Sequence, residues 1–430
     1  MNYFRYSTMT DEEKQKILKR AETDISQQME LAKEVSEQVR REGDSAVLRY
    51  TKEFDRVDLT DKGLKVTQQE IDQAYNRLDK KTLEAIEYAA KNIRNFHEKQ
   101  MPEEMWFTHV DQGIMTGEKT TPIVDACLYV PGGKGSFPSV LLMLGIPAVV
   151  AGVPKIVVVT PPNKDGGVDD AILAAAKVIG IEEIYKVGGI QAIAAVAFGT
   201  QTIPKCHKVI GPGNTYATAA KRVLANYIDT GLPAGPSEAI ILTDDSADPH
   251  KVALDWMIEA EHGPDSASLL VTTSEEIAQK AMEIVKVQLE KISPRRREFI
   301  ETNFSTYGGV VIVDSIEQGV EFVNEYAPEH MEVMTKEPFV TLEKIKNAGE
   351  ILLGDYTPVT LCNFVMGPNA ILPTGGFAKT YSSVSVMDFL KRSSVGYVSK
   401  EGFERVRDHA YRIATVEGFD THGLAVKERK

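Results

Sequence analysis

The sequence has 430 residues, of which 43% are hydrophobic and 26% charged, and its formal net charge is −13. This composition is typical of a folded protein with more than one core and excludes a disordered chain. The acidic balance, without a stripe of lysine and arginine, argues against a nucleic-acid binder.

The first part of the chain is predicted to be helical. Residues 11–50 are charged and carry apolar side chains at helical spacing, such as Ile17, Ile25 and Met29. Residues 67–100 have the same character. Neither segment shows a candidate site.

From about residue 124, short apolar runs alternate with amphipathic segments. The predicted strands are 124–130, 155–160, 184–187, 208–211, 239–243, 268–273, 309–314, 331–335 and 350–355. Helices are expected between them, for example at 168–180, 190–199 and 214–228, and the last stretch, 385–430, is helical and charged again. This alternation indicates βαβ units and mostly parallel sheets, so we predict an α/β fold with two doubly wound domains.

Three turns after predicted strands are rich in glycine: Gly132 to Gly135, Gly188 to Gln191, and Gly211 to Asn214. Dinucleotides bind at the carboxyl ends of strands in open α/β sheets, where glycine lets the backbone approach phosphates. None of the turns completes the pattern GxGxxG, and each one alone is better explained as a tight turn. Three in succession favour an anionic ligand without identifying it.

Glu259 and His262 lie three residues apart, ahead of a Gly-Pro break. On a helix this spacing places both side chains on one face, where they could hold one metal ion. The commoner occurrence of such a pair is a hydrogen bond at the surface.

Glu329 and His330 follow Pro328 and open a predicted strand. Consecutive residues of a strand point to opposite faces, whereas a turn would let both side chains line one cleft. Adjacent titratable groups suit general acid–base chemistry, and the alternative is a polar strand end without a catalytic role. His422 lies near the C-terminus, where histidines are usually exposed.

The sequence carries no sign of export or membrane insertion. The three cysteines, Cys127, Cys206 and Cys362, show no CxxC spacing and fit a reducing compartment. The N-terminal stretch lacks the apolar core of a signal peptide, and the most apolar stretch, 140–153, is too short to span a bilayer. We therefore expect a cytoplasmic protein.

A series of longer runs resembles the histidinol dehydrogenase family. In family order they are YVPGGKGSFPS (129–139), VGGIQAIAAVAFGT (187–200), IGPGNTYATAAKR (210–222), AGPSEAIIL (234–242), AEHGPDS (260–266), NEYAPEH (324–330), LPTGGFAKTYSS (372–383) and VEGFDTHGLAV (416–426). They span roughly residues 120–426, and AEHGPDS and YAPEH are long enough to be specific.

The resemblance implies two incomplete Rossmann-like domains and small helical terminal pieces. The implied divisions are residues 1–25, residues 26–128 together with 238–384, residues 129–237 as the NAD-associated domain, and residues 385–430 as a piece that reaches the partner subunit of a homodimer. Members of the family oxidise a primary alcohol through an aldehyde to a carboxylate, using two NAD in turn and one zinc.

Carried over motif by motif, the resemblance places a catalytic pair at Glu329 and His330. His330 would take the hydroxyl proton, and Glu329 would activate the water that attacks the aldehyde. The other implied positions are NAD contacts at Tyr129, Gln191 and Asn214, substrate-pocket positions at Ser237, Glu417, Val359 and Ala370, and zinc ligands at Glu259, His262, Asn363 and His422, the last of these reaching into the partner's site.

Four of these positions depart from the family's pattern. Position 259 is usually Gln and position 363 usually Asp. In this chain the carboxylate is at Glu259 and the amide at Asn363, so the net charge of the ligand set is unchanged. Zinc, with manganese as the alternative, therefore remains the expected metal. Val359 replaces a pocket Glu and Ala370 a pocket His, so the substrate pocket loses two polar groups.

We accordingly expect an NAD-dependent alcohol dehydrogenase of this type, with L-histidinol as the leading named substrate. The alternatives are a paralogue that oxidises another small polar alcohol, such as sulfopropanediol, and a catalytically silent binding protein on the same scaffold. The retained Glu329–His330 pair and the glycine turns favour an enzyme. The sequence leaves open which alcohol is the substrate and whether oxidation stops at the aldehyde.

Overall fold

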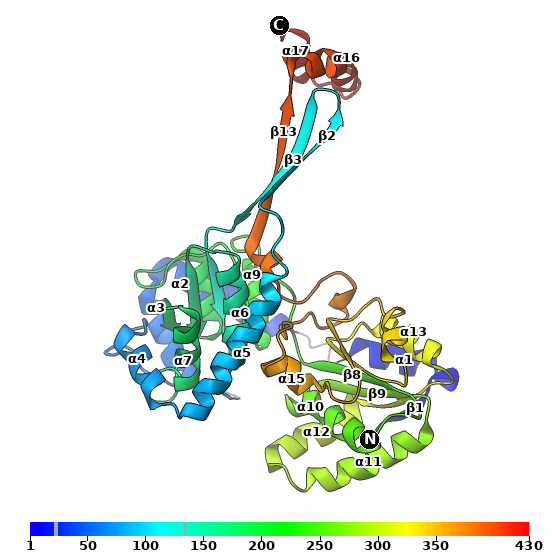
Figure 1. Cartoon of the computed structure of the whole chain (residues 1–430). Helices are drawn as coiled ribbons and strands as arrows, with labels where there is room; N and C mark the ends of the chain where they lie inside the picture. The colour runs from blue at the N-terminus through cyan, green and yellow to red at the C-terminus, as the bar shows by residue number, and fades with distance from the viewer. Residues whose placement is uncertain (21–24, 133–134, 430) are drawn as a thin grey trace. The chain divides into compact units, whose positions relative to one another are not determined.

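The computed structural model describes residues 1–20, 25–132 and 135–429. It divides into two compact units, Met1–Gln100 with Val124–Asp388 and Met101–Ile123 with Phe389–Lys430 (Figure 1). The larger unit contains two parallel sheets, and the smaller unit contains an antiparallel one. None of the helices in the described ranges combines the length and apolarity that crossing a bilayer requires.

The first parallel sheet has the strand order β6-β5-β4-β7. Its strands are β4 (Ala126–Tyr129), β5 (Ile156–Thr160), β6 (Ile184–Lys186) and β7 (Val209–Ile210). The helices that share a buried apolar cluster with Cys127 and Tyr129 of β4 are α2 (Ser26–Glu42), α3 (Asp44–Tyr50), α8 (Gly189–Phe198) and α9 (Thr215–Leu224). Leu128 points to the opposite face because side chains alternate along a strand, and the helices packed together on that side are α4 (Gln68–Arg77), α5 (Lys80–Glu98), α6 (Pro138–Val150) and α7 (Asp170–Ile179).

The second parallel sheet has the strand order β1-β10-β9-β8-β11-β12. Its strands are β1 (Tyr3–Arg5), β8 (Glu238–Thr243), β9 (Ala267–Thr272), β10 (Gly309–Ile312), β11 (His330–Met334) and β12 (Glu350–Leu353). Helices α10 (Pro249–Ile258), α11 (Glu275–Leu289) and α12 (Pro294–Thr306) cover one face, and α1 (Asp11–Lys19) and α13 (Ile316–Tyr326) cover the other (Figure 1). Two short helices, α14 (Pro338–Leu342) and α15 (Val359–Phe364), precede and follow β12.

The smaller unit has the strand order β13-β3-β2, with β2 (Met105–Asp111), β3 (Ile114–Pro122) and β13 (Leu390–Val398). Two helices complete it, α16 (Lys400–Val416) and α17 (Asp420–Lys427). Every residue of β2 is exposed, including Trp106 and Phe107. The remaining short helical turns of the chain are η1 (Tyr6–Thr8), η2 (Thr51–Asp55), η3 (Glu259–Glu261), η4 (Phe377–Lys379) and η5 (Val386–Phe389).

The α/β class and the parallel strands predicted between residues 124 and 355 are confirmed. The helix expected over 11–50 is divided into α1, α2 and α3, with positive φ angles at Arg20 and Gly43, although residues 21–24 lie outside the described ranges. The strands β1, β2, β3 and β13 were not predicted. β2 and β13 are mostly exposed, so they lack the buried apolar run that identifies a strand.

The observed packing bears on the domain division that the resemblance implied. Helices α2 and α3 share the apolar cluster of the four-stranded sheet, whereas α5 packs against α6 and also contacts residues 365 and 369. The apolar cluster matches Val35 and Val39 of α2 with the alanine-rich inner faces of α8 and α9. The C-terminal unit begins at Phe389, and it includes the hairpin of β2 and β3. The implied division of the chain into domains stays a prediction.

Candidate active site

A cluster of buried polar side chains lies at the amino ends of neighbouring strands in the six-stranded sheet. Glu238, His330 and Glu350 are the first residues of β8, β11 and β12, and the parallel register places His330 beside Glu350 and Ala239. Glu238, Glu329, His330 and Glu350 are all at least nine-tenths buried. Ligands of parallel sheets usually bind at the carboxyl ends of strands, so this cluster has the opposite location.

A turn directs Glu329 and His330 toward the same place. Helix α13 ends at Tyr326, its C-cap Ala327 has a φ of 54°, and β11 begins at His330, so Glu329 belongs to the turn. The Nε2 atom of His330 lies 3.8 Å from Oε1 of Glu329. The second oxygen of Glu329 accepts a hydrogen bond from the backbone N–H of Glu238 at 2.9 Å. The two side chains therefore converge, as a turn rather than a regular strand allows.

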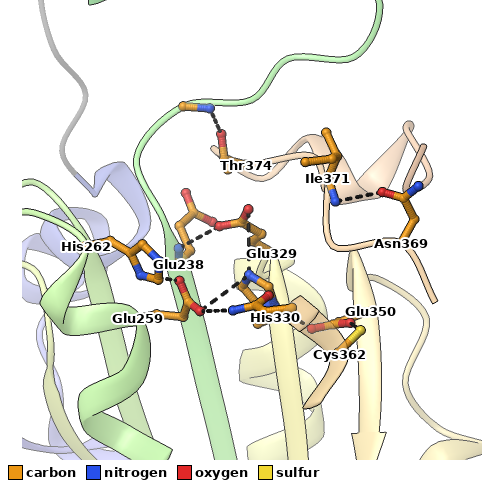
Figure 2. A network of polar contacts seen from close by, with 12 residues as sticks. Glu238, Glu259, His262, Glu329, His330, Glu350, Cys362, Asn369, Ile371 and Thr374 are labelled. Atoms are coloured by element: carbon orange, nitrogen blue, oxygen red, sulfur yellow. Dashed lines mark hydrogen bonds and ion pairs between the residues drawn. The ribbon is translucent and has the colours of Figure 1, made fainter. Parts of the chain in front are cut away.

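Glu259 and His262 also contact one another, and Asn363 joins them (Figure 2 labels the first two). Nδ1 of His262 lies 2.9 Å from Oε2 of Glu259, and Nδ2 of Asn363 lies 3.0 Å from its Oε1. The same Oε1 lies 3.8 Å from Nε2 of His330. Glu259 is 1% exposed, so this pair is not the ordinary surface hydrogen bond.

The close carboxylates and imidazoles shift one another's pKa values. Burial would lower the pKa of His330, but Glu259, Glu329 and Glu350 outweigh it and raise that pKa to about 10. Burial raises the pKa of Glu329 to about 8, although His330 opposes the shift. Burial also opposes ionisation of Glu259, but His262 and His330 overcome it and lower the pKa of Glu259 to about 2. Glu259 is thus a permanent carboxylate, whereas Glu329 can exchange a proton near neutral pH.

The donor set of Glu259, His262 and Asn363 has the chemistry for a divalent metal. A carboxylate oxygen, an imidazole nitrogen and an amide oxygen are all ligands that zinc or manganese accepts. Glu259 contacts both of the other side chains, His262 through one carboxylate oxygen and Asn363 through the other. Within the described ranges, no group of three His, Cys, Asp or Glu side chains has a metal-binding arrangement, and His422 is exposed in the smaller unit.

The positions implied to contact NAD lie at the carboxyl end of the four-stranded sheet. Tyr129 ends β4 and accepts a hydrogen bond from the N–H of Gly189 at 3.0 Å. Gln191 lies in the first turn of α8 and is 1% exposed, and Asn214 caps the N-terminus of α9. Free N–H groups at helix N-termini suit phosphate binding.

Gly211 shows why one glycine turn requires glycine. Its φ is 135°, and a Cβ there would lie 2.2 Å from the carbonyl oxygen of Tyr129. No side chain fits that approach. In the turn at 132–135, Gly133 and Lys134 lie outside the described residues.

The substrate-pocket positions are divided between the two units. Ser237 precedes Glu238 and is partly buried, and Ala370 is partly buried after α15. Val359 is 1% exposed, and its N–H donates to Oε1 of Glu332 at 2.6 Å. Glu417 is exposed at the end of α16, in the smaller unit with His422.

Some residues of the cluster were not predicted. Glu238 pairs with Arg20 at 3.0 Å and accepts a hydrogen bond from the N–H of Gly375 at 2.7 Å. Glu350 contacts both His330 and the thiol of Cys362. A charged residue that opens a buried apolar strand, as in EAIILT and EILL, is the signal that could have identified both glutamates.

Comparison with known proteins identifies the family of the chain. A family model described as histidinol dehydrogenase matches residues 18–430. Histidinol dehydrogenase of Synechocystis sp. is 47% identical over 426 residues, which cover 99% of this chain and 98% of the relative. A histidinol dehydrogenase homolog of Rhizobium meliloti is 48% identical over 427 residues, which cover 99% and 94%.

Among solved structures, the histidinol dehydrogenase from Elizabethkingia anophelis has a TM-score of 0.94 and 36% identity, and the match covers 99% of this chain and 96% of that one. An acetylating aldehyde dehydrogenase from Geobacillus thermoglucosidasius, at 12% identity and a TM-score of 0.50, shares the fold alone. The family model, the relatives and the near-identical fold all extend over almost the entire sequence, and the chain therefore belongs to the histidinol dehydrogenase family of NAD-dependent oxidoreductases.

Proposed function

We propose that this chain oxidises a small polar primary alcohol with NAD, through an aldehyde to a carboxylate. The observation that carries the proposal is the convergence of Glu329 and His330 in a buried site of an NAD-dependent oxidoreductase family. Reduction of NAD by a panel of small alcohols tests it. Absence of reduction with every alcohol would favour the silent binding protein.

In this proposal, the neutral form of His330 accepts the hydroxyl proton while the alcohol carbon gives its hydride to NAD. Because the neighbouring carboxylates raise the pKa of His330 to about 10, this form becomes more populated, and alcohol oxidation faster, as the pH rises toward that value. Glu329 then takes a proton from the water that attacks the aldehyde, and the resulting hydrate gives its hydride to a second NAD to leave the carboxylate. A base with a pKa near the working pH suits that second step, and burial brings the pKa of Glu329 to about 8. Glu329→Gln should impair oxidation of added aldehyde more than oxidation of alcohol. Equal losses in both steps would contradict this division of roles.

Glu259, His262 and Asn363 would hold one zinc ion per subunit, with His422 of the neighbouring subunit as the fourth ligand. A bound divalent ion supplies a Lewis acid that polarises the oxygen of the alcohol. Metal analysis after gentle purification tests the site. Less than about a tenth of an equivalent of zinc, with no gain of activity when zinc is added, would refute the site. A structural or catalytic ion should instead be bound at close to one equivalent per subunit.

A homodimer follows from the same assignment, because His422 lies in the unit that would complete the partner's site. The exposed apolar side chains of that unit support a partner: Trp106 and Phe107 are more than two-fifths exposed, and Val416 is 86% exposed. Light scattering should give a dimer mass, and a monomer would count against the shared site. The cysteines in the described chain are all free and buried, which supports a reducing compartment such as the cytoplasm.

The substrate within this class depends on the pocket. L-histidinol is the named candidate, and relatives of 46% to 48% identity include a histidinol dehydrogenase and two proteins named as histidinol dehydrogenase homologs. Val359 and Ala370 favour the alternative, another polar alcohol such as sulfopropanediol, because each lost charge-assisted hydrogen bond removes about 1.5–3 kcal/mol of binding. Efficient turnover of micromolar histidinol would refute the paralogue, and no turnover at millimolar concentration would refute histidinol.

A further inference from the structure

Glu350 lies beside the proposed base without facing the place where Glu259, Glu329 and His330 converge. The parallel pairing of β11 and β12 sets His330 directly against Glu350, so both side chains project from the same face of the sheet. Nδ1 of His330 lies 2.5 Å from Oε1 of Glu350. His330 is 3% exposed and Glu350 9%, so water competes little for this hydrogen bond.

The contact determines which nitrogen of His330 faces the converging carboxylates. An ionised carboxylate accepts hydrogen bonds and donates none, so the ring must carry a proton on Nδ1. Nε2 is then the nitrogen that gains and loses a proton. It lies 3.8 Å from Glu259 and 3.8 Å from Glu329, on the side of the ring away from Glu350 (Figure 2).

Glu350 is itself held in place. Its second oxygen accepts a hydrogen bond from the thiol of Cys362, which also lies 3.7 Å from the carbonyl oxygen of Pro368. The thiol of Cys362 is the donor in this contact, and both Cys362 and Glu350 are at least nine-tenths buried. Cys362 lies in α15 next to Asn363, so one short helix supports both the proposed metal ligand and the carboxylate behind His330.

We propose that Glu350, held by Cys362, is a positioning residue that fixes the ring and the tautomer of His330. The inference rests on the proposed function, in which His330 is the base. Residues that orient a functional histidine through its second nitrogen typically contribute about 10- to 100-fold to activity.

Steady-state kinetics of the full-length enzyme test the proposal. Glu350→Ala should lower kcat by about 10- to 100-fold, with KM for alcohol and for NAD changed by less than about threefold, because Glu350 touches neither. Glu350→Gln should recover most of the loss, since its amide oxygen can still accept the Nδ1 proton. Asp125→Asn is the matched control: Asp125 is a buried carboxylate that contacts a histidine outside the site, His207, and the kcat of this variant should stay within about twofold of the wild type.

A spectroscopic readout separates this proposal from the proposed function. With ¹⁵N-labelled histidine, the Nδ1 proton of His330 should give a downfield signal that is protected from exchange, in either protonation state of Nε2. The signal should disappear in His330→Asn and in Glu350→Ala, and it should move upfield in Glu350→Gln. If the alanine variant does not fold, the upfield shift in Glu350→Gln is the test.

The outcomes are distinct. If none of the tested alcohols lets the wild-type enzyme reduce NAD, but the NMR signal behaves as described, the proposed function fails and the positioning contact stands. If His330→Asn is inactive while Glu350→Ala keeps the wild-type kcat, loses activity through KM alone, or retains the signal, the positioning role is overturned.

Discussion

The family usually has its carboxylate at position 363, whereas this chain has it at position 259. The substitutions Asn363→Asp and Glu259→Gln together would restore the usual arrangement. In the structure, Nδ2 of Asn363 donates to Oε1 of Glu259 at 3.0 Å. Asn363→Asp replaces that donor with a second carboxylate. Two unit charges about 3 Å apart repel by about 5 kcal/mol at an effective dielectric of about 20. Because Asn363 is only partly buried, solvent should reduce the loss of stability to about 2–4 kcal/mol.

The assay is urea unfolding of the metal-free protein for the wild type, Asn363→Asp, Glu259→Gln and the double variant. The double variant should regain most of the stability that Asn363→Asp loses, because the amide introduced at position 259 can donate to the new carboxylate and the net charge is that of the wild type. Zinc should stabilise Asn363→Asp more than the wild type, since an ion between two carboxylates turns their repulsion into attraction.

This reasoning would be refuted by a metal-free Asn363→Asp variant as stable as the wild type, together with additive effects in the double variant. Residues in contact should show a coupling free energy of at least about 1 kcal/mol in such a cycle. Additivity would mean that the two side chains do not share one site in solution.

His330→Asn should lower kcat for alcohol oxidation by about 100-fold or more while the melting temperature stays close to that of the wild type, as expected for loss of a general base; unchanged turnover would remove His330 from the mechanism. Gly211→Ala should weaken NAD binding or destabilise the fold by more than about 1 kcal/mol, because its Cβ would collide with the carbonyl oxygen of Tyr129; normal NAD titration and unfolding curves would contradict this. Arg20→Leu should cost about 3 kcal/mol at about pH 8.5 and less at about pH 5.5. The sign follows from Glu238, whose pKa burial raises to about 7 although Arg20 opposes the shift. The folded protein keeps the stability that Glu238 contributes while its carboxyl is protonated at low pH, and loses it as the pH rises through about 7. Without Arg20 the ionised carboxylate loses its ion-pair partner, so the folded protein loses more of that stability. Equal deficits at the two pH values would show that this pair is not the cause.

The parallel strands could be predicted because each is a short apolar run that is buried on both faces, as in Val157 to Thr160. The convergence of Glu329 and His330 could be proposed but not decided from the sequence, since it depends on the turn at Ala327 and on the strand starting at His330, so that Glu329 lies before it. The partnership of Glu350 with His330 could not be predicted, because it arises from strand pairing over twenty positions and from register.

Other features depend on contacts between distant parts of the chain. Arg20 ends a helix that showed no site in the sequence, yet its guanidinium pairs with Glu238 and lies 3.7 Å from the centre of the Tyr326 ring. The packing of α2 and α3 against the four-stranded sheet likewise follows from complementary apolar faces, which local periodicity does not reveal.

The place of β1 has a consequence for protein synthesis. This strand is made first, but it pairs with Val310 to Ile312 of β10, whereas the four-stranded sheet and its helices are all made by Leu224. Domains form as the ribosome releases them, and contacts between distant residues form slowly. The sheet that carries Glu238, His330 and Glu350 can therefore be completed only after the four-stranded sheet. A chain arrested before β12 would have a complete four-stranded sheet with its helices but would lack Glu350 and so part of the carboxylate–histidine cluster.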